Sequence, residues 1–224
     1  MEENDGPISD AGYGMKNLKT GIFFHRSFFL HDTGLHHPEN HNRVDKIINI
    51  LKNFKSDSLI NFSCPYVTEK QLHLVHDKSY VDKVINYFPL KESIFLDSDT
   101  VLSPGSLEAL LRSPGGVISA IEMVNSYKIK NAFCVVRPPG HHATFSNGMG
   151  FCVFNNIAIG AAYAREQLGI KKIAIIDLDV HHGNGTEEWA RNEENYLFTS
   201  IHQSPLYPGT GVDLNHSKRN IINY

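Results

Sequence analysis

The chain has 224 residues and a mass of 25.2 kDa, and its 41% hydrophobic and 20% charged residues are typical of one globular domain. Its net charge of -3 gives no general attraction to nucleic acid or to an anionic membrane, and no apolar run reaches the roughly 20 residues that a membrane helix needs. Residues 1–20 are expected to form a flexible polar arm without the apolar segment of a signal peptide. Because the three cysteines form no CxxC pair, we expect a reducing compartment: the cytoplasm, or the nucleus in a eukaryote.

Helices and strands alternate along the rest of the chain. Apolar residues at i, i+3, i+4 and i+7 from Val44 indicate an amphipathic helix, and Gly169 is expected to end a later one. In chain order we predict a strand over 21–24, helices over 42–54, 77–88 and 103–128 (with an interruption near Pro114), a strand from 131 that prolines end, a helix over 155–169, and strands over 171–180 and 196–202. This order predicts one α/β domain with a mainly parallel sheet covered by helices on both faces. No strand precedes a G-x-G-x-x-G or a phosphate-binding lysine loop, which disfavours a nucleotide-binding protein.

Polar residues follow three of the predicted strands. One strand leads to Arg137 and the pair His141-His142, and the next leads into the string "DLDVHHGNG". The last ends in Ser200-Ile-His202. In open α/β sheets ligands bind beyond the carboxyl ends of the strands, so these residues are expected to share a site.

The string after the second of these strands offers ligands for a metal ion. Residues two apart in a strand point to one side, so Asp177, Asp179 and His181 are expected on the same face. An oxygen from Asp179 and a nitrogen from His181 suit zinc or another borderline metal, whereas Asp177, one step deeper, is placed to orient an imidazole. Turn residues are the alternative for a lone D-x-H, but burying carboxylates without a cation is costly, which favours the metal.

His141 and His142 follow a rigid Pro-Pro-Gly turn and can act as a general base and its electrostatic partner. Each needs a carboxylate or amide on its other nitrogen, and Asp177 and Asn184 are the natural candidates. Two loop histidines without a role are the alternative. The glycines of "SNGMGF" and "HGNG" fit a site where the backbone closely approaches a ligand, or ordinary turns.

Long strings in a fixed order resemble the histone deacetylase family, including its bacterial relatives and the acetylpolyamine amidohydrolases. They are "HHPENHNR" (36–43), "LDSDTVLSPGSLEALL" (96–111), "RPPGHHA" (137–143), "NGMGFCVFNNIAIGA" (147–161), "IIDLDVHHGNGTEE" (175–188) and "SIHQSPLYPGTG" (200–211). The absence of a tryptophan from "RPPGHHA", and Asn184 in place of an aspartate, are similar to class II members. The resemblance implies an arginase/deacetylase-like fold over residues 21–224, corresponding to the N-terminal two thirds of the family's domain.

The resemblance also implies roles for the histidines and acids. Asp179 and His181 correspond to two of three ligands of a catalytic zinc, with iron(II) as a second possibility. His142 corresponds to the general base and His141 to its partner. Asp177 would hold His141, and Asn184 would hold His142. A structural potassium ion would use Asp177, Asp179, His181, Ser200 and Ile201, partly through backbone carbonyls.

Other residues resemble the family's substrate channel. Phe151 and Tyr207 correspond to its aromatic walls, with Gly150 beside them. Asp97 or Asp99 corresponds to the carboxylate at its rim. The implied reaction removes an acetyl group from acetyl-lysine in a histone or other protein, or from an acetylated polyamine or small amide, with no direct binding to nucleic acid or membrane.

Two catalytic features of the family have no counterpart in this sequence: the third metal ligand, in a "GFD" string, and the oxyanion-stabilising tyrosine beside a Gly-Gly pair. Asp213 and His216 lie in a predicted loop, and nothing in the pattern recruits either as a ligand. A deacetylase-like module that binds acylated partners without hydrolysing them is therefore an alternative, as is an incomplete fragment. Substrate, metal and oligomeric state stay open.

Overall fold

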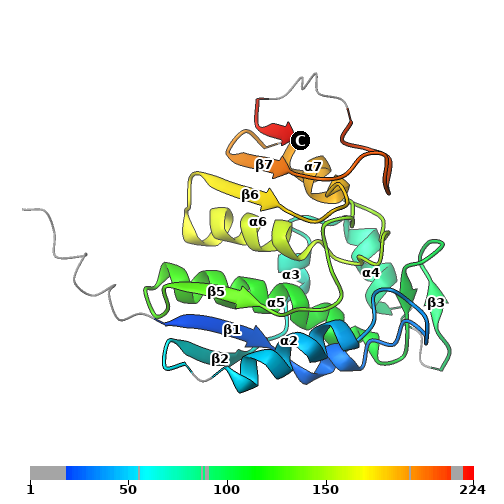
Figure 1. Cartoon of the computed structure of the whole chain (residues 1–224). Helices are drawn as coiled ribbons and strands as arrows, with labels where there is room; N and C mark the ends of the chain where they lie inside the picture. Colours follow the sequence, from blue (N-terminus) through cyan, green and yellow to red (C-terminus); the bar gives the residue numbers. More distant parts are fainter. Residues whose placement is uncertain (1–18, 55, 87, 89–90, 192, 213–218) are drawn as a thin grey trace, which may run out of the picture.

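The computed structural model describes residues 19–54, 56–86, 88, 91–191, 193–212 and 219–224, so nearly all of the arm expected over 1–20 lies outside the described residues (Figure 1). Parallel strands form two three-stranded sheets, with orders β2-β1-β5 and β6-β7-β8. The strands are β1 (Thr20–Phe24), β2 (Leu59–Ser63), β5 (Asn131–Cys134), β6 (Ile173–Asp177), β7 (Tyr196–Ser200) and β8 (Ile221–Asn223), and β3 (Ile94–Phe95) pairs with β4 (Val101–Leu102) in a separate antiparallel ribbon.

Helices connect the parallel strands, and the predicted α/β class is confirmed. The longest helix, α5, packs against α6, and the main apolar core lies around these two. The helices are η2 (Arg26–Phe29, a 3-10 turn), α2 (Asn42–Asn53), α3 (Glu69–Leu72), α4 (Lys78–Asn86), α5 (Ser106–Asn125), α6 (Asn156–Leu168) and α7 (Asn184–Arg191). Among the helices described, none combines the length and apolar character needed to cross a bilayer.

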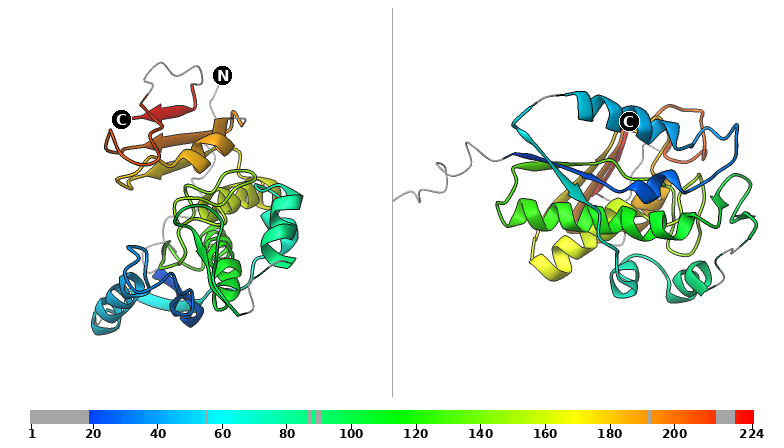
Figure 2. Two further views of the ribbon diagram at one scale, coloured as in Figure 1. Left: turned by 90° about the vertical axis from the view of Figure 1, so that its right-hand side faces the viewer. Right: turned by 90° about the horizontal axis from the view of Figure 1, so that it is seen from below.

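The first sheet is covered by helices on both faces, as Figure 2 shows for α2 and α5. Ile22 of β1 packs in a cluster with Val44 and Ile48 of α2. The next residue, Phe23, packs on the other side in a cluster with Ala109 of α5. This alternation is expected of a strand buried on both faces.

The second sheet differs from the prediction, because in the described part of the chain helices cover only one of its faces. Ile175 and Phe198 pack in one cluster with Ala161 of α6 and Ala190 of α7. On the other face Ile176 is 66% exposed. The apolar run alone indicated burial on both faces, which the described residues do not provide.

Three further predictions about elements need correction. Helix α5 is continuous through Pro114, and the two glycines after it let the helix backbone pack closely against the Cys64–Tyr66 segment. The strand from 131 is exposed over most of its length rather than buried. The strand predicted over 171–180 ends at Asp177, so Asp179 and His181 lie in the loop that follows it.

Candidate active site

A pocket of about 320 Å³ opens where the segments after β5 and β6 meet. It collects most of the residues singled out in the sequence, although they come from five separate stretches of the chain. Its lining consists of Pro38, Glu39, Arg43, Asp99, Pro139, His141, His142, Gly150, Phe151, Asp179, His181 and Tyr207.

The two histidines after β5 each have one nitrogen occupied. Nδ1 of His141 lies 2.8 Å from Oδ2 of Asp177, and Nδ1 of His142 lies 2.7 Å from Oδ1 of Asn184. The Asn184 amide nitrogen donates to the backbone oxygen of His142, so its Oδ1 is the acceptor and Nδ1 of His142 carries the proton. In the neutral ring, Nε2 of His142 is left with a lone pair.

The environment of His142 favours its neutral form. Burial lowers the pKa of His142 to about 4, and the neighbouring charges of His141 and His181 act in the same direction. The rings of His141 and His142 lie with centroids 3.9 Å apart. At neutral pH the His142 imidazole can therefore accept a proton.

Asp179 and His181 are the candidate metal ligands in this pocket. Oδ1 of Asp179 lies 2.9 Å from Nδ1 of His181, close to the roughly 3 Å that separates two ligands bound at about 2 Å to one ion. Burial alone would raise the pKa of the Asp179 carboxyl, but the backbone N–H of His181 and the charge of His141 outweigh it and lower the pKa. The pair thus offers an ionised oxygen and an imidazole nitrogen, which fit two coordination positions of a borderline metal.

The predicted potassium ligands meet at the carboxyl ends of β6 and β7. Asp177 is paired in register with Ser200, and the backbone N–H of Ile201 donates to the carbonyl oxygen of Asp177 at 3.0 Å. Side-chain oxygens here have partners: Oδ2 of Asp177 bonds to His141, and Oγ of Ser200 bonds to Nδ1 of His202. An ion at this point would therefore depend on the backbone carbonyls.

Two aromatic rings, those of Tyr207 and Phe151, line the pocket. The ring of Tyr207 lies edge-on to His142, with centroids 5.1 Å apart, and Phe151 packs edge-on to His37 at 4.7 Å. Gly150, which precedes Phe151, has a φ of +55°, and a Cβ there would come within 2.5 Å of His142 and 2.8 Å of Tyr207. Only glycine leaves this space open, so Gly150 has a steric role in the pocket.

Asp97 and Asp99 have different environments. Asp97 accepts hydrogen bonds from the backbone N–H groups of Asp99 and Thr100, which outweigh burial and lower the pKa of its carboxyl. Asp99 lines the pocket, and burial together with the charge of Asp97 raises the pKa of its carboxyl. The structure therefore makes Asp99 the rim candidate, whereas Asp97 organises the turn behind it.

The family assignment follows from comparison with known proteins. The family model described as "Histone deacetylase domain" matches residues 37–223. The chain belongs to the histone deacetylase family. It is 37% identical over 197 residues to a "Probable deacetylase" of Archaeoglobus fulgidus, covering 87% of this chain and 54% of that protein. It is 34% identical to "Histone deacetylase 5" of Arabidopsis thaliana, covering 89% of this chain and 31% of that protein.

The structural comparison agrees with this assignment. The crystal structure of the HDA15 HD domain superimposes with a TM-score of 0.84 at 31% identity, covering 92% of this chain and 62% of that one. The deacetylase-like fold is thus shown. This chain spans about half the length of the archaeal relative and 15% of "Type-2 histone deacetylase 2" of Dictyostelium discoideum.

Sequence reasoning gave no role to several residues that support this candidate site. Glu39 and Arg43 line the pocket, and the buried Arg137 is bonded to the carboxylate of Glu39 at 2.8 and 3.0 Å. Arg137 also donates to the backbone oxygens of Phe28 and His31. The string "HHPENHNR" could have indicated this pair, because it places the carboxylate of Glu39 in a predicted site segment, where a charged partner is expected.

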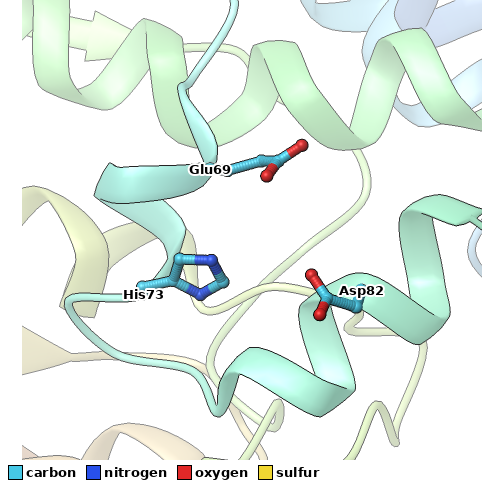
Figure 3. Close-up of side chains that lie close together, drawn as sticks. All are labelled: Glu69, His73 and Asp82. Atoms are coloured by element: carbon cyan, nitrogen blue, oxygen red, sulfur yellow. The ribbon is translucent and has the colours of Figure 1, made fainter.

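One further group of possible ligands lies away from the candidate pocket. Figure 3 shows Glu69 and His73, at and just after α3, facing Asp82 of α4, and their ligand atoms lie within 4.8 Å of one another. The ammonium of Lys78 is 2.6 Å from Asp82, so one of the two carboxylates of this group already has a cation beside it. Among the described residues, Glu69, His73 and Asp82 are the group of three that could hold a metal. No third described ligand joins Asp179 and His181 in the pocket. Asp213 and His216 lie outside the described residues.

Proposed function

We propose that this chain carries the general base, substrate channel and two metal ligands of a metal-dependent deacetylase acting on acetyl-lysine, or on a related acetylated amine. The observation that carries the proposal is the His142–Asn184 pair, which leaves Nε2 of a neutral imidazole available in the pocket formed by Asp179, His181 and the aromatic rings. Family membership supports the reaction class.

The channel residues select the substrate. The rings of Phe151 and Tyr207 would hold the four-carbon stem of an acylated lysine, whose neutral amide loses little on entering an apolar passage. Unmodified lysine would have to lose the water around its ammonium group, at a cost of several kcal/mol. Asp99 at the rim would accept hydrogen bonds from the substrate backbone.

The histidines handle the proton. A zinc or iron(II) ion held by Asp179 and His181 would act as a Lewis acid that polarises the amide carbonyl. Nε2 of His142 would take a proton from the attacking water and return it to the leaving nitrogen as the C–N bond breaks, which gives acetate and a free amine. His141, held by Asp177, would stabilise the negative charge that develops on the oxygen of the attacked amide. A potassium ion on the carbonyls at the ends of β6 and β7 would fix the ligand loop.

The test is acetate release from an acetyl-lysine peptide by the wild type and by His142→Ala, with zinc added. General-base catalysis contributes on the order of 100- to 10,000-fold, so the variant should lose at least about 100-fold in kcat. The exposed His36→Ala serves as the control and should keep the wild-type rate. An unchanged rate in His142→Ala would refute the assigned base.

A second candidate function is binding of acylated partners without hydrolysis. It is favoured by one observation, that the described residues bring two rather than three metal ligands to the pocket. Binding of the acetyl-lysine peptide with no acetate release at added zinc would support it over the first.

A further inference from the structure

His182 follows the candidate ligand His181, yet its ring is buried outside the pocket lining. Both of its nitrogens have partners. Nε2 lies 2.8 Å from Oε2 of Glu187, and Nδ1 lies 2.7 Å from the hydroxyl oxygen of Thr210. The ring therefore connects helix α7 to the loop over 203–212.

Glu187 gives this connection a fixed end. Glu187 lies on α7, and its Oε2 also accepts a hydrogen bond from Asn223 of β8. Arg191 donates to its Oε1. These bonds hold it as a carboxylate, which can only accept, so Nε2 of His182 is the donor to it. Nδ1 then faces the Thr210 hydroxyl, a group able to donate or accept.

The loop at the other end carries the channel wall. Tyr207 lies on it, three residues before Thr210, and packs against His142. Gly209 and Gly211, on either side of Thr210, both have positive φ, at +81° and +79°. Glycine restricts its own backbone less than other residues do, so the side-chain bond of Thr210 restrains this part of the loop.

Two close contacts hold the loop against the segment over 180–182. A Cβ on Gly211 would come within 2.6 Å of both His182 and His202. At the other end of the loop, the backbone N–H of Gln203 donates to the carbonyl of Val180 at 2.9 Å. The loop is thus held at its two ends, with Tyr207 between them.

We propose that His182 is a positioning residue for the substrate channel: the Glu187–His182–Thr210 chain fixes the loop over 203–212 and thereby the Tyr207 wall. The inference rests on the proposed function for its effect on substrate, because the wall matters only if an acyl-lysine stem enters the pocket. The effect on the loop itself is independent of that function.

The experiment separates the two bonds of His182. Thr210→Val removes the hydroxyl and Thr210→Ser keeps it. His182→Asn keeps a polar atom near the position of Nδ1, whereas His182→Gln keeps one near the position of Nε2 and loses the contact with Thr210. Thr68→Val, which removes the capping hydroxyl of the distant helix α3, is the matched control.

Two quantities are measured in the full chain. One is hydrogen exchange of the Gly209 amide, which donates to the carbonyl of Leu206 and reports opening of the loop. The other is the dissociation constant of an acetyl-lysine peptide with zinc present. Loss of one hydrogen bond should raise both by about five-fold in Thr210→Val and His182→Gln. Thr210→Ser and Thr68→Val should stay near the wild type, whereas His182→Asn, which keeps the bond to Thr210 but breaks the bond to Glu187, should also raise both quantities because the chain loses its fixed end.

The outcomes are distinct. Gly209 exchange that is unchanged in Thr210→Val, or raised equally in Thr210→Ser, would overturn the inference. Should the wild type bind no acetyl-lysine peptide, the proposed function fails while the exchange measurement still decides the role of His182. Should the His182 variants fail to fold, the two Thr210 variants decide it alone.

Discussion

Asn184 sets the tautomer of His142, because its side-chain oxygen, 2.7 Å from Nδ1, faces the ring as an acceptor. The orientation is fixed by the Asn184 amide nitrogen, which donates to the backbone oxygen of His142 and to Sδ of Met149. The base, on the segment that follows β5, is thereby oriented by a residue at the start of α7. The two segments meet only in the folded chain.

Replacing Asn184 by alanine tests this orientation. The Nδ1 proton of His142 would lose its acceptor, and the other tautomer, which cannot accept a proton at Nε2, would become accessible. Removal of such an orienting partner typically costs about 10- to 100-fold, so kcat for acetate release should fall by at least ten-fold with little change in KM. Asn49→Ala, at an exposed position on α2, is the control. A wild-type kcat in Asn184→Ala would show that His142 is oriented by other contacts.

Gly150 and Gly169 form a matched pair for testing the shape of the pocket. Both have positive φ, at +55° and +70°, so alanine strains the backbone at either position. Only at Gly150 would the new Cβ meet His142 and Tyr207; at Gly169 nothing lies within 4 Å. Gly150→Ala should weaken binding of an acetyl-lysine peptide by about ten-fold more than Gly169→Ala, measured by calorimetry. Equal affinities in the two variants would contradict the role of Gly150 in the pocket.

His76 predicts how stability depends on pH. Burial lowers its pKa to about 4, and its Nε2 accepts from the backbone N–H of Asn155 at 2.8 Å, a bond that protonation would break. The unfolded chain takes up a proton near pH 6.5, so this contribution to stability is present above pH 6.5 and is lost as the pH falls toward 4. His76 alone should lower the free energy of unfolding by about 2 kcal/mol between pH 7 and pH 5.

Urea unfolding at the two pH values measures this difference. His76→Phe should reduce it, although that variant is also expected to be less stable at pH 7 because the Asn155 N–H loses its acceptor. His31, whose pKa burial lowers to about 3, should still contribute in the same direction. A stability that is equal at pH 5 and pH 7 would contradict the neutral, buried state of these rings.

The Arg137–Glu39 pair predicts a large loss of stability. Both side chains are almost fully buried, and Arg137 also bonds to three backbone oxygens. Arg137→Met leaves the Glu39 carboxylate with the exposed Arg43 as its arginine partner, and should cost about 3 to 5 kcal/mol in free energy of unfolding. Arg165→Met, at a more exposed position, should cost less than about 1 kcal/mol. Similar losses in the two variants would contradict the structural role of Arg137.

The α/β class predicted from the sequence is confirmed, and most of the residues predicted for the site lie together, although their roles stay predictions. His141, His142, Asp177 and Asn184 were recognisable because acids and imidazoles directly follow apolar strands. Strand β2 was missed because it is largely exposed and carries no continuous apolar run. Helix α7 was missed because Gly185 suggested a turn, whereas its missing Cβ lets the helix approach the carbonyl of Ala143.

The remaining errors share one physical cause. Local patterns describe a residue's neighbours along the chain, and Pro114, Glu39 and His182 are explained only by contacts across the fold. The helix continues through Pro114 where the two glycines after it pack against the segment that follows β2. Glu39 and His182 are held by partners distant in sequence, Arg137 and Thr210.

Zinc binding by the purified chain tests the central claim most directly. Calorimetric titration should give one site in the wild type, weakened at least ten-fold in His181→Ala and unchanged in His73→Ala, which removes the imidazole of the Glu69–His73–Asp82 group. That pattern would place the metal on the Asp179–His181 pair beside the general base. Wild-type affinity in His181→Ala, or its loss in His73→Ala, would contradict a metal site in the deacetylase pocket.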